Sequence, residues 1–436
     1  MKKIALINHG CAKNLVDSEL MLGILSQDGY KITLDDTKAD IVIINTCSFI
    51  HDAETESVQS ILEMVNEGKK VIITGCLPQK HKEELKKAIP EAVAFLGTSD
   101  YGKIAEVIKK IEKNPEEVIF EVTEKPDYDY SEETQRQQIT VGSSSYIKIA
   151  DGCNFECGYC IIPKLRGPYK SRTMENIEKE ARQLAQKGVS EIVLIAQDTT
   201  SYGMDLYKKP MLAQLLYKLN EIEELNWIRI MYTYPSMITD DLLEAIAKLD
   251  KVVKYIDIPL QHSSKNVLKL MKRPTEDYKK LINKMRKIIP SIAIRTTFIV
   301  GYPGETQEDF EHLYNFIQEM KFDKLGVFEY SKEKETYAYS LPDQVPSRIK
   351  KQRKNKLMKL QQKISRSINE SMKGKTIDCI VETVGEDGSI TARTYKDAPE
   401  VDGLIFVESE DILVPGDIVK IKVTMANEYD LFGTFG

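Results

Sequence analysis

Short apolar runs alternate with helix-length segments along most of this chain of 436 residues, and this alternation restricts the fold more than any other feature. In the first part of the chain the apolar runs are 3–7, 40–45, 70–74 and 93–96, and helical spacing occupies 17–25, 56–65 and 83–88. Strands that alternate with helices in sequence form parallel sheets. We therefore expect an N-terminal parallel α/β domain over residues 1–125.

A polar, charged stretch at residues 126–138 has no apolar period, and we interpret it as a linker. Beyond it the alternation resumes, with six apolar runs at 146–150, 191–196, 227–232, 255–259, 293–300 and 324–330. Helical spacing separates them at 174–186, 211–222, 240–249, 278–289 and 307–320. Six such units are fewer than a closed (β/α)8 barrel requires, so we expect a partial (β/α)6 barrel over residues 139–368. In such barrels the chemistry lies at the C-terminal ends of the strands.

The last part of the chain, residues 369–436, has short β-rich runs at 376–381, 389–393, 403–407 and 418–424 with glycine-rich turns between them. This pattern predicts a small all-β barrel of five strands, similar to oligonucleotide-binding barrels. Residues 371–436 contain 13 acidic and 6 basic residues, a net charge of −7. A surface of this sign repels phosphate and suits a basic protein partner. Cys379 falls within a strand pattern, and we expect it in the core.

Just before this barrel, residues 347–366 contain nine Lys or Arg residues and no acidic residue. Apolar residues recur there at helical spacing, which predicts an amphipathic helix with one basic face. Two interpretations stay open for that face. It is either a solvated surface of a connecting helix or a contact with RNA or the ribosome.

Composition restricts the cellular compartment in which the protein is expected. No apolar run approaches the roughly 20 residues of a membrane span, and the N-terminal run is too short for a signal peptide. We therefore expect no membrane association and a cytoplasmic location. Seven cysteines are too few for a disulfide scaffold, and in a reducing compartment they indicate metal binding or catalysis.

Three of these cysteines, Cys153, Cys157 and Cys160, form a C-x3-C-x2-C array directly after the first strand of the expected barrel. Short spacings of this kind let one loop hold an iron–sulfur cluster through thiolates. Because a cubane has four irons, three ligands leave one iron open to another molecule. The alternative is a structural zinc site, but zinc sites usually combine two C-x2-C pairs or add histidine, and neither is present here.

A second set of three cysteines follows the first three strands of the N-terminal domain. Cys11, Cys47 and Cys76 each come within a few residues after a strand, in turns with small or amide residues. Ligands of open parallel sheets bind outside the carboxyl ends of the strands. The three thiols should therefore converge and hold a second cluster. Taken singly, each could instead be an ordinary buried cysteine.

Polar residues near the other strand ends of the expected barrel suit a small charged ligand. Candidates for its binding residues are Tyr159, Gln197, Asp198, Gln261, Arg295 and Gly301. Glycine allows a ligand to approach the backbone closely. Each residue alone could be ordinary loop chemistry, but together they surround the cysteine array.

The cysteine array with Tyr159 before its last thiol resembles the radical S-adenosylmethionine (radical SAM) enzymes. The additional Cys11, Cys47 and Cys76, the barrel and a C-terminal TRAM domain resemble the methylthiotransferase family of these enzymes over essentially the whole chain. Further signatures lie at residues 10–19, 45–50, 150–155, 160–167, 196–203 and 259–264. Within the family, the resemblance is strongest to the RimO type, and the sequence keeps all six cysteine positions.

This resemblance implies two 4Fe–4S clusters and S-adenosylmethionine as cofactors. Cys153, Cys157 and Cys160 would hold the cluster that generates a 5′-deoxyadenosyl radical, and Cys11, Cys47 and Cys76 an auxiliary cluster that presents the sulfur. The implied product is a methylthio group on the β-carbon of an aspartate of small-ribosomal-subunit protein twelve, either free or on the ribosome, with a flavodoxin or ferredoxin as electron donor. Alternatives are a tRNA methylthiotransferase of the MiaB type, a two-cluster electron carrier and a zinc-stabilised binding module.

Overall fold

The computed structural model describes residues 2–48, 50–128, 136–139 and 142–436. Residues 129–135 of the predicted linker lie outside this described part. Two compact units divide the chain. The first comprises Met1–Val141, Ala150–Phe155 and Cys160–Lys170, and the second comprises Gly142–Ile149, Glu156–Tyr159 and Ser171–Gly436.

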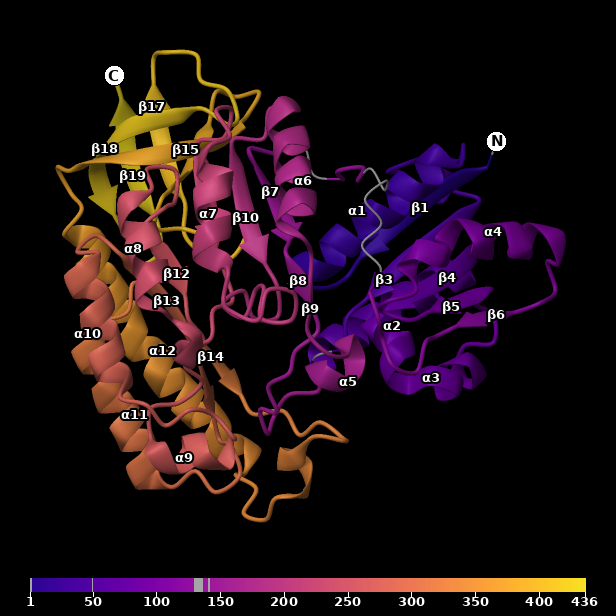
Figure 1. Cartoon of the computed structure of the whole chain (residues 1–436), viewed down its shortest axis with the longest axis horizontal. Helices are drawn as coiled ribbons and strands as arrows, with labels where there is room; N and C mark the ends of the chain where they lie inside the picture. Colours follow the sequence, from indigo (N-terminus) through magenta and orange to yellow (C-terminus); the bar gives the residue numbers. More distant parts are fainter. Residues whose placement is uncertain (1, 49, 129–135, 140–141) are drawn as a thin grey trace. The chain divides into compact units, whose positions relative to one another are not determined.

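The first unit contains a six-stranded parallel sheet in the order β2-β1-β3-β4-β5-β6 (Figure 1). Its strands are β1 (Lys3–Asn8), β2 (Lys31–Ile32), β3 (Ile41–Thr46), β4 (Lys70–Gly75), β5 (Ala94–Leu96) and β6 (Ile119–Glu121). The predicted parallel α/β domain is confirmed, and four of these strands lie in the predicted runs. The edge strands β2 and β6 were not predicted.

Helices cover both faces of this sheet: α1 (Ala12–Gln27), α2 (His51–Asn66), α3 (Cys76–Ala88) and α4 (Ile104–Lys113). Ile41 and Ile43 of β3 pack in one apolar cluster with α1 and α4. Val42 and Ile44 point to the opposite face and pack with α2 and α3. Successive strand residues face opposite sides, so burial on both faces explains why the central strands are continuously apolar.

The second unit begins with six parallel strands that follow the predicted runs. They are β7 (Ser144–Lys148), β10 (Glu191–Ile195), β11 (Trp227–Ile230), β12 (Tyr255–Asp257), β13 (Ala293–Val300) and β14 (Lys324–Glu329). They form the orders β11-β10-β7 and β12-β13-β14. A bridge between Ile228 and Val252 and a 2.9 Å hydrogen bond from the Thr233 amide to the Asp257 carbonyl join the two halves. The predicted partial barrel is confirmed.

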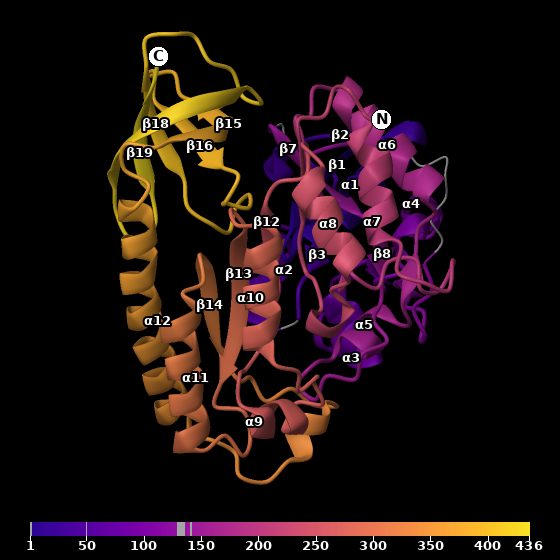
Figure 2. The same cartoon turned by 60° about the vertical axis from the view of Figure 1, so that its left-hand side comes forward.

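Helices of the second unit include α6 (Met174–Gln186), α7 (Leu212–Asn220), α8 (Asp240–Lys248), α9 (Lys265–Leu270), α10 (Tyr278–Ile288), α11 (Gln307–Met320) and α12 (Ser347–Glu370). The short elements α5 (Ile162–Arg166), β8 (Ala150–Asp151) and β9 (Lys170–Ser171) follow the first barrel strand in sequence. Helix α12 is the predicted basic helix, and it lies beside α11 and β14 (Figure 2). None of the described helices is long and apolar enough to cross a membrane.

The C-terminal strands close into a barrel in the order β15-β16-β17-β19-β18. They are β15 (Thr376–Val384), β16 (Ile390–Thr394), β17 (Ile405–Ser409), β18 (Ile418–Ala426) and β19 (Leu431–Phe435). This confirms the predicted five-stranded barrel, and Cys379 lies in its core as expected. The small barrel belongs to the same compact unit as the large one.

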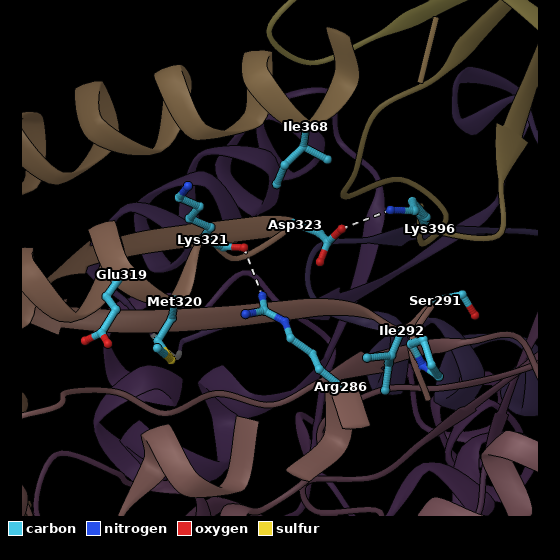
Figure 3. A pocket seen from close by; sticks show the side chains of 10 residues that line it. Arg286, Ser291, Ile292, Glu319, Met320, Lys321, Asp323, Ile368 and Lys396 are labelled. Atoms are coloured by element: carbon cyan, nitrogen blue, oxygen red, sulfur yellow. Dashed lines mark hydrogen bonds and ion pairs between the residues drawn. The ribbon is translucent and has the colours of Figure 1, made fainter. Parts of the chain in front are cut away.

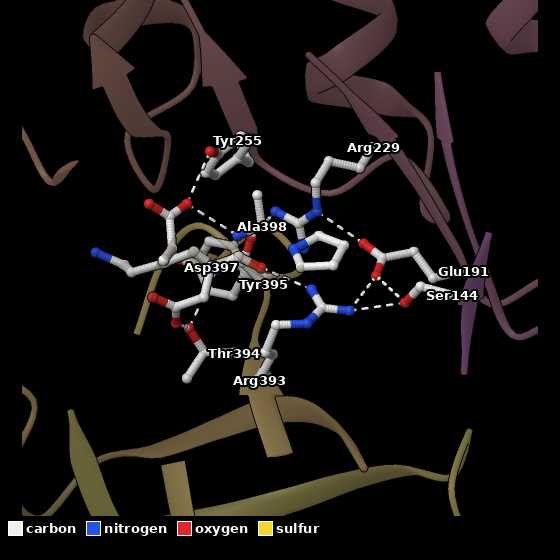
Figure 4. A network of polar contacts seen from close by, with 12 residues as sticks. Ser144, Glu191, Arg229, Tyr255, Arg393, Thr394, Tyr395, Asp397 and Ala398 are labelled. Atoms are coloured by element: carbon white, nitrogen blue, oxygen red, sulfur yellow. Dashed lines mark hydrogen bonds and ion pairs between the residues drawn. The ribbon is translucent and has the colours of Figure 1, made fainter. Parts of the chain in front are cut away.

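A buried charged network joins the two barrels (Figure 4). The Glu191 carboxylate on β10 accepts a 2.7 Å hydrogen bond from Nε of Arg229 on β11 and pairs with Arg393 on β16. Arg393 also donates to the hydroxyl of Ser144 at 2.8 Å. All three charged side chains are essentially inaccessible to water. The small barrel is therefore held by paired buried charges.

Candidate functional site

The three cysteines of the first unit lie at the carboxyl ends of adjacent strands. Cys11 follows β1 and caps the N-terminus of α1, Cys47 comes directly after β3, and Cys76 is the first residue of α3 directly after β4. Strands β1, β3 and β4 are neighbours in the sheet. Both Cys11 and Cys47 act electrostatically on Cys76. The structure thus brings together thiols that are up to 65 positions apart in the sequence.

Backbone geometry at these turns leaves no space for larger residues. Gly75 has a φ of +95°, and a β-carbon there would lie 2.4 Å from Oδ1 of Asn45 and 2.7 Å from the carbonyl oxygen of Thr46. The Asn45 side chain in turn donates to the carbonyl of Asn14 at 2.8 Å. Glycine at 75 therefore permits the close approach of β3 and β4 that places Cys76 beside Cys47.

The cysteines of this triad differ in exposure and electrostatics. Burial raises the pKa of the Cys76 thiol to about 12, and the neighbouring Arg166 opposes this only in part. At the more exposed Cys11, loss of water around the sulfur raises the pKa, but the charges of Lys13 and Arg166 outweigh it, so the net pKa is lowered. The neighbouring cations thus favour the thiolate form at Cys11, whereas at Cys76 the effect of burial prevails.

Arg166 is a buried cation in the first unit. Its guanidinium donates to Asp17 at 2.9 Å, to Asp151 at 3.1 Å and to Oδ1 of Asn14 at 2.6 Å. It also contacts Cys76. Because Asp151 lies two residues before Cys153, Arg166 ties the start of the cysteine loop to the turns that carry the first triad.

These residues fit an iron–sulfur cluster. Cys11 and Cys76 stand at helix N-termini, where unpaired backbone N–H groups and the helix dipole stabilise anionic sulfur. In the described part of the chain, no three His, Cys, Asp or Glu side chains converge as they would on a single metal ion. Cubane ligands bind separate irons, so a cluster does not require such convergence.

The second triad lies on one loop, whose residues are divided between the two compact units. In the first unit, the Cys153 amide donates to the carbonyl of Gly167 at 3.1 Å. In the second, the Gly158 amide donates to the carbonyl of Met271 at 2.8 Å, and the Gly158 carbonyl accepts from the Ala338 amide at 2.7 Å. Both parts of the loop are therefore fixed by backbone hydrogen bonds.

Arg273 lies beside the part of the loop that belongs to the second unit. One of its terminal nitrogens is 3.6 Å from Sγ of Cys157 and 3.3 Å from the Tyr159 hydroxyl. The other donates to the carbonyl of Pro259 at 2.7 Å. Tyr159, a candidate ligand-binding residue, is thus placed next to the end of the fourth barrel strand.

The remaining candidates separate into two groups. Gln197 and Asp198 follow β10, Gln261 pairs with Phe298 of β13, and Gly301 directly follows β13, so these four lie at or near C-terminal strand ends. Arg295 instead lies near the start of β13, where its guanidinium is 3.0 Å from Asp257 and 3.4 Å from Asp402 of the small barrel. The structure therefore places Arg295 at the junction of the barrels, away from the other candidates on its strand.

Contacts around the first group show how each residue is held. The buried Asp198 carboxylate accepts from the Thr200 amide at 2.9 Å and from the hydroxyl of Ser201, which fixes the loop after β10. Gln261 has a φ of +69° and exchanges backbone hydrogen bonds with β13. Gly301 donates its amide to the buried Glu305 carboxylate. Hydrogen bonds therefore fix the conformation of these turns.

Sequence reasoning assigned no role to Arg273 or Arg166, and it did not predict the pairing of His262 with Glu305. Arg166 and His262 lie within the family-like signatures, but their partners are far away in sequence. His262 is fully buried, and its Nε2 lies 3.7 Å from Glu305. Arg273 stands in a loop between α9 and α10 with no pattern that indicates it.

An open groove of about 340 Å³ lies elsewhere in the second unit (Figure 3). Its lining includes Ser291 and Ile292 before β13, Asp323 before β14, and Lys396 of the small barrel, which pairs with Asp323 at 3.1 Å. It therefore lies at the N-terminal ends of the strands, the side of such barrels that serves stability rather than chemistry.

Three family profiles match successive parts of the chain. Residues 3–97 match the uncharacterized protein family UPF0004, residues 147–317 the Radical SAM superfamily, and residues 374–435 the TRAM domain. The chain is 48% identical to the ribosomal protein uS12 methylthiotransferase RimO of Caldanaerobacter subterraneus subsp. tengcongensis, over 100% of both chains. It is 46% identical to the protein of the same name from Clostridioides difficile, over 99% of this chain and 98% of that one.

Solved structures show the fold. The radical S-adenosylmethionine methyltransferase TsrM from Kitasatospora setae aligns with a TM-score of 0.57 at 14% identity, over 75% of this chain and 73% of that one. The cobalamin-dependent S-adenosylmethionine radical enzyme OxsB aligns with a TM-score of 0.52 at 13% identity, over 82% of this chain and 56% of that one.

Proposed function

Because the chain belongs to the RimO family of ribosomal protein uS12 methylthiotransferases, which are radical SAM enzymes, we propose that it adds a methylthio group to the β-carbon of an aspartate of uS12. The observation that carries this proposal is identity of 44–48% with proteins of that name over nearly their whole length. A tRNA methylthiotransferase of the MiaB type is not favoured.

Cys153, Cys157 and Cys160 would hold the cluster that works with S-adenosylmethionine, and Cys11, Cys47 and Cys76 the auxiliary cluster. When bound, these cofactors supply the radical, the sulfur and the methyl group for substitution at an unactivated C–H bond, which amino-acid side chains do not provide. The protein's own residues would bind these cofactors and orient them. In the first unit the helix N-termini at Cys11 and Cys76 would stabilise thiolate ligands, and in the second unit Arg273 lies beside Cys157.

For S-adenosylmethionine we propose Tyr159, Gln197, Asp198, Gln261 and Gly301 as binding residues. Their position at C-terminal strand ends and in rigid turns supports this set, since a rigid scaffold holds a small ligand without loss of loop entropy. Arg295 is left out, because Asp257 and Asp402 already pair with its guanidinium.

The acidic TRAM barrel supports a protein rather than an RNA partner. Its net charge of −7 over residues 371–436 repels phosphate and complements a basic ribosomal protein. We further propose that modification takes place in the cytoplasm, where ribosomal proteins assemble, and that a flavodoxin or ferredoxin supplies electrons. Whether uS12 is modified free or on the ribosome is part of the same test.

The test is incubation of the anaerobically prepared enzyme with S-adenosylmethionine, a low-potential reductant and one of three substrates: free uS12, the small ribosomal subunit or tRNA. We expect mass spectrometry to detect a methylthio gain on an aspartate of uS12. A gain on tRNA alone would overturn the substrate assignment. Iron content should approach about eight atoms per chain, as two cubanes require.

A further inference from the structure

Arg273 differs from the other buried arginines in its lack of a carboxylate partner. Six arginines are buried in the described part of the chain: Arg136, Arg166, Arg229, Arg273, Arg353 and Arg393. Five of them pair with at least one Asp or Glu. Among the described residues, no Asp or Glu oxygen lies within 4.0 Å of Arg273, and its Nε has no hydrogen-bond partner.

A buried guanidinium without a counter-charge is costly, because arginine stays protonated and loses its hydration. The contacts of Arg273 are neutral or weakly acidic. They include the Pro259 carbonyl, the hydroxyls of Tyr159 and Tyr278, the Cys157 sulfur and the face of the Tyr234 ring, whose centroid lies 4.5 Å from the guanidinium carbon. Of these groups, the Cys157 sulfur is the one expected to carry negative charge at neutral pH, once it binds iron as a thiolate.

The backbone fixes Cys157 against this cation. Gly158 is hydrogen-bonded to Met271, two residues before Arg273. A β-carbon on Gly158 would lie 2.6 Å from the Tyr302 hydroxyl and 3.2 Å from the carbonyl of Leu270, so the loop packs closely against the end of α9. The spacing between Cys157 and Arg273 is therefore set by the fold and does not depend on a flexible side chain alone.

We propose that Arg273 is a positioning residue that supplies the counter-charge of the cluster held by Cys153, Cys157 and Cys160. Its N–H group donates to the Cys157 thiolate and favours the cluster's one-electron-reduced form, which carries one more negative charge. The step is the transfer of one electron from a low-potential reductant, and no bond forms or breaks. The inference rests on the proposed function for the presence of that cluster.

Redox titration of the holoenzyme in the absence of S-adenosylmethionine, followed by electron paramagnetic resonance, tests this proposal. With Arg273→Met, we expect the reduced fraction of one cluster to fall at least tenfold at a fixed applied potential, equivalent to a midpoint shift of 59 mV for a one-electron couple. The auxiliary cluster of the same molecules should keep its midpoint and is the internal control. Arg273→Lys should recover part of the shift, because it restores the charge.

A second measurement separates this role from a purely structural one. In the chain prepared without iron, Arg273→Met should unfold at the wild-type temperature or above it, because the substitution removes an uncompensated buried charge. Arg229→Met, which leaves Glu191 with one cation fewer, should unfold at a lower temperature. If Arg273→Met destabilises the iron-free chain as much as Arg229→Met does, Arg273 is structural and the proposal fails.

The remaining outcomes are also decisive. Unchanged midpoints of both clusters in Arg273→Met overturn the proposal, even if affinity for S-adenosylmethionine falls, since the residue would then bind that ligand instead. The result is independent of the substrate assignment. If the enzyme modified tRNA, the midpoint shift in Arg273→Met would still be expected. If the enzyme modified uS12 but showed no midpoint shift, the proposed function would stand and the role proposed for Arg273 would be overturned.

Discussion

Gly152 shows how closely the chain approaches itself beside the cysteine loop. Its φ is +75°, and a β-carbon would lie 2.0 Å from the carbonyl oxygen of Pro168 and 2.7 Å from that of Gly167. The neighbouring Cys153 amide donates to that same Gly167 carbonyl at 3.1 Å. A side chain at 152 would therefore separate the two segments that orient Cys153.

We predict that Gly152→Ala prevents assembly of one cluster. Both the backbone clash and the positive φ act against the substitution, so iron content should fall to about half of the two-cubane value. Gly188→Ala is the matched control, because Gly188 has a φ of +90° but nothing within 4 Å of its added β-carbon. The stability of this control variant should fall by only about 1–2 kcal/mol, and it should keep its iron. Equal iron in the two variants would contradict the clash argument.

The two cysteine triads give a further prediction at the residue level. Cys157→Ala should reduce cleavage of S-adenosylmethionine to background, because it removes a ligand of the cluster that binds this molecule. Cys47→Ala should leave cleavage intact and stop methylthio transfer. Product analysis for 5′-deoxyadenosine and for modified uS12 measures both. A similar loss of cleavage in both variants would show that the triads do not have separate roles.

The sequence predicted the cysteines but not the arginines around them. Cysteine positions after strands follow from periodicity, which one segment reveals by itself. Arg166 contacts Asp17, which is 149 positions away in the sequence, and Arg273 contacts Cys157, which is 116 positions away. Pairing across such distances depends on the packing of whole elements, which no local pattern encodes. For the same reason Arg295 was grouped with ligand-binding residues although its partners lie at the barrel junction.

At the level of elements, helix α12 shows both what composition predicts and what it misses. Its basic, amphipathic character was predicted, and exposed positions such as Lys359 and Lys363 form the basic face. Arg353, however, lies on the buried face with Leu357 and Gln361. Its guanidinium donates to the carbonyls of residues 305 and 306, each at 3.2 Å. One of the nine basic residues is thus a packing residue, whatever the exposed face contacts.

We predict that Arg353→Met destabilises the second unit by about 3–5 kcal/mol, because it leaves the buried Glu305 without its cation. The Glu305 carboxylate also accepts from the amides of Gly301 and Tyr302, so affinity for S-adenosylmethionine should fall as well. Denaturant unfolding and equilibrium binding measure the two effects. Lys363→Met on the exposed face is the control, and its stability should change by less than about 0.5 kcal/mol.

At the level of the whole chain, the TRAM barrel and the large barrel form one compact unit rather than two independent domains. The sequence predicted each barrel, since each has its own strand pattern. Their fixed junction was not predictable, because Glu191, Arg229 and Arg393 come from three strands of two different barrels. An attached TRAM barrel presents its acidic surface at a fixed position relative to the strand ends of the large barrel. Loss of that junction should therefore weaken binding of the protein substrate more than binding of S-adenosylmethionine.

The junction should also respond to acid. Burial raises the pKa of Glu191, but Arg229 and Arg393 outweigh it and lower the pKa to about 2. An unfolded glutamate titrates near 4.3. The stabilisation by Glu191, roughly 3 kcal/mol, is therefore complete above about pH 4.5 and is lost as the pH falls toward 2.

Glu191→Gln should lower the denaturation midpoint of the iron-free chain at pH 7, and its difference from the wild type should shrink by more than half at pH 3. Glu244→Gln, which breaks an exposed pair with Lys248, should change stability by less than about 1 kcal/mol at either pH. A Glu191→Gln difference of the same size at both pH values would mean that the junction does not depend on the charge of Glu191.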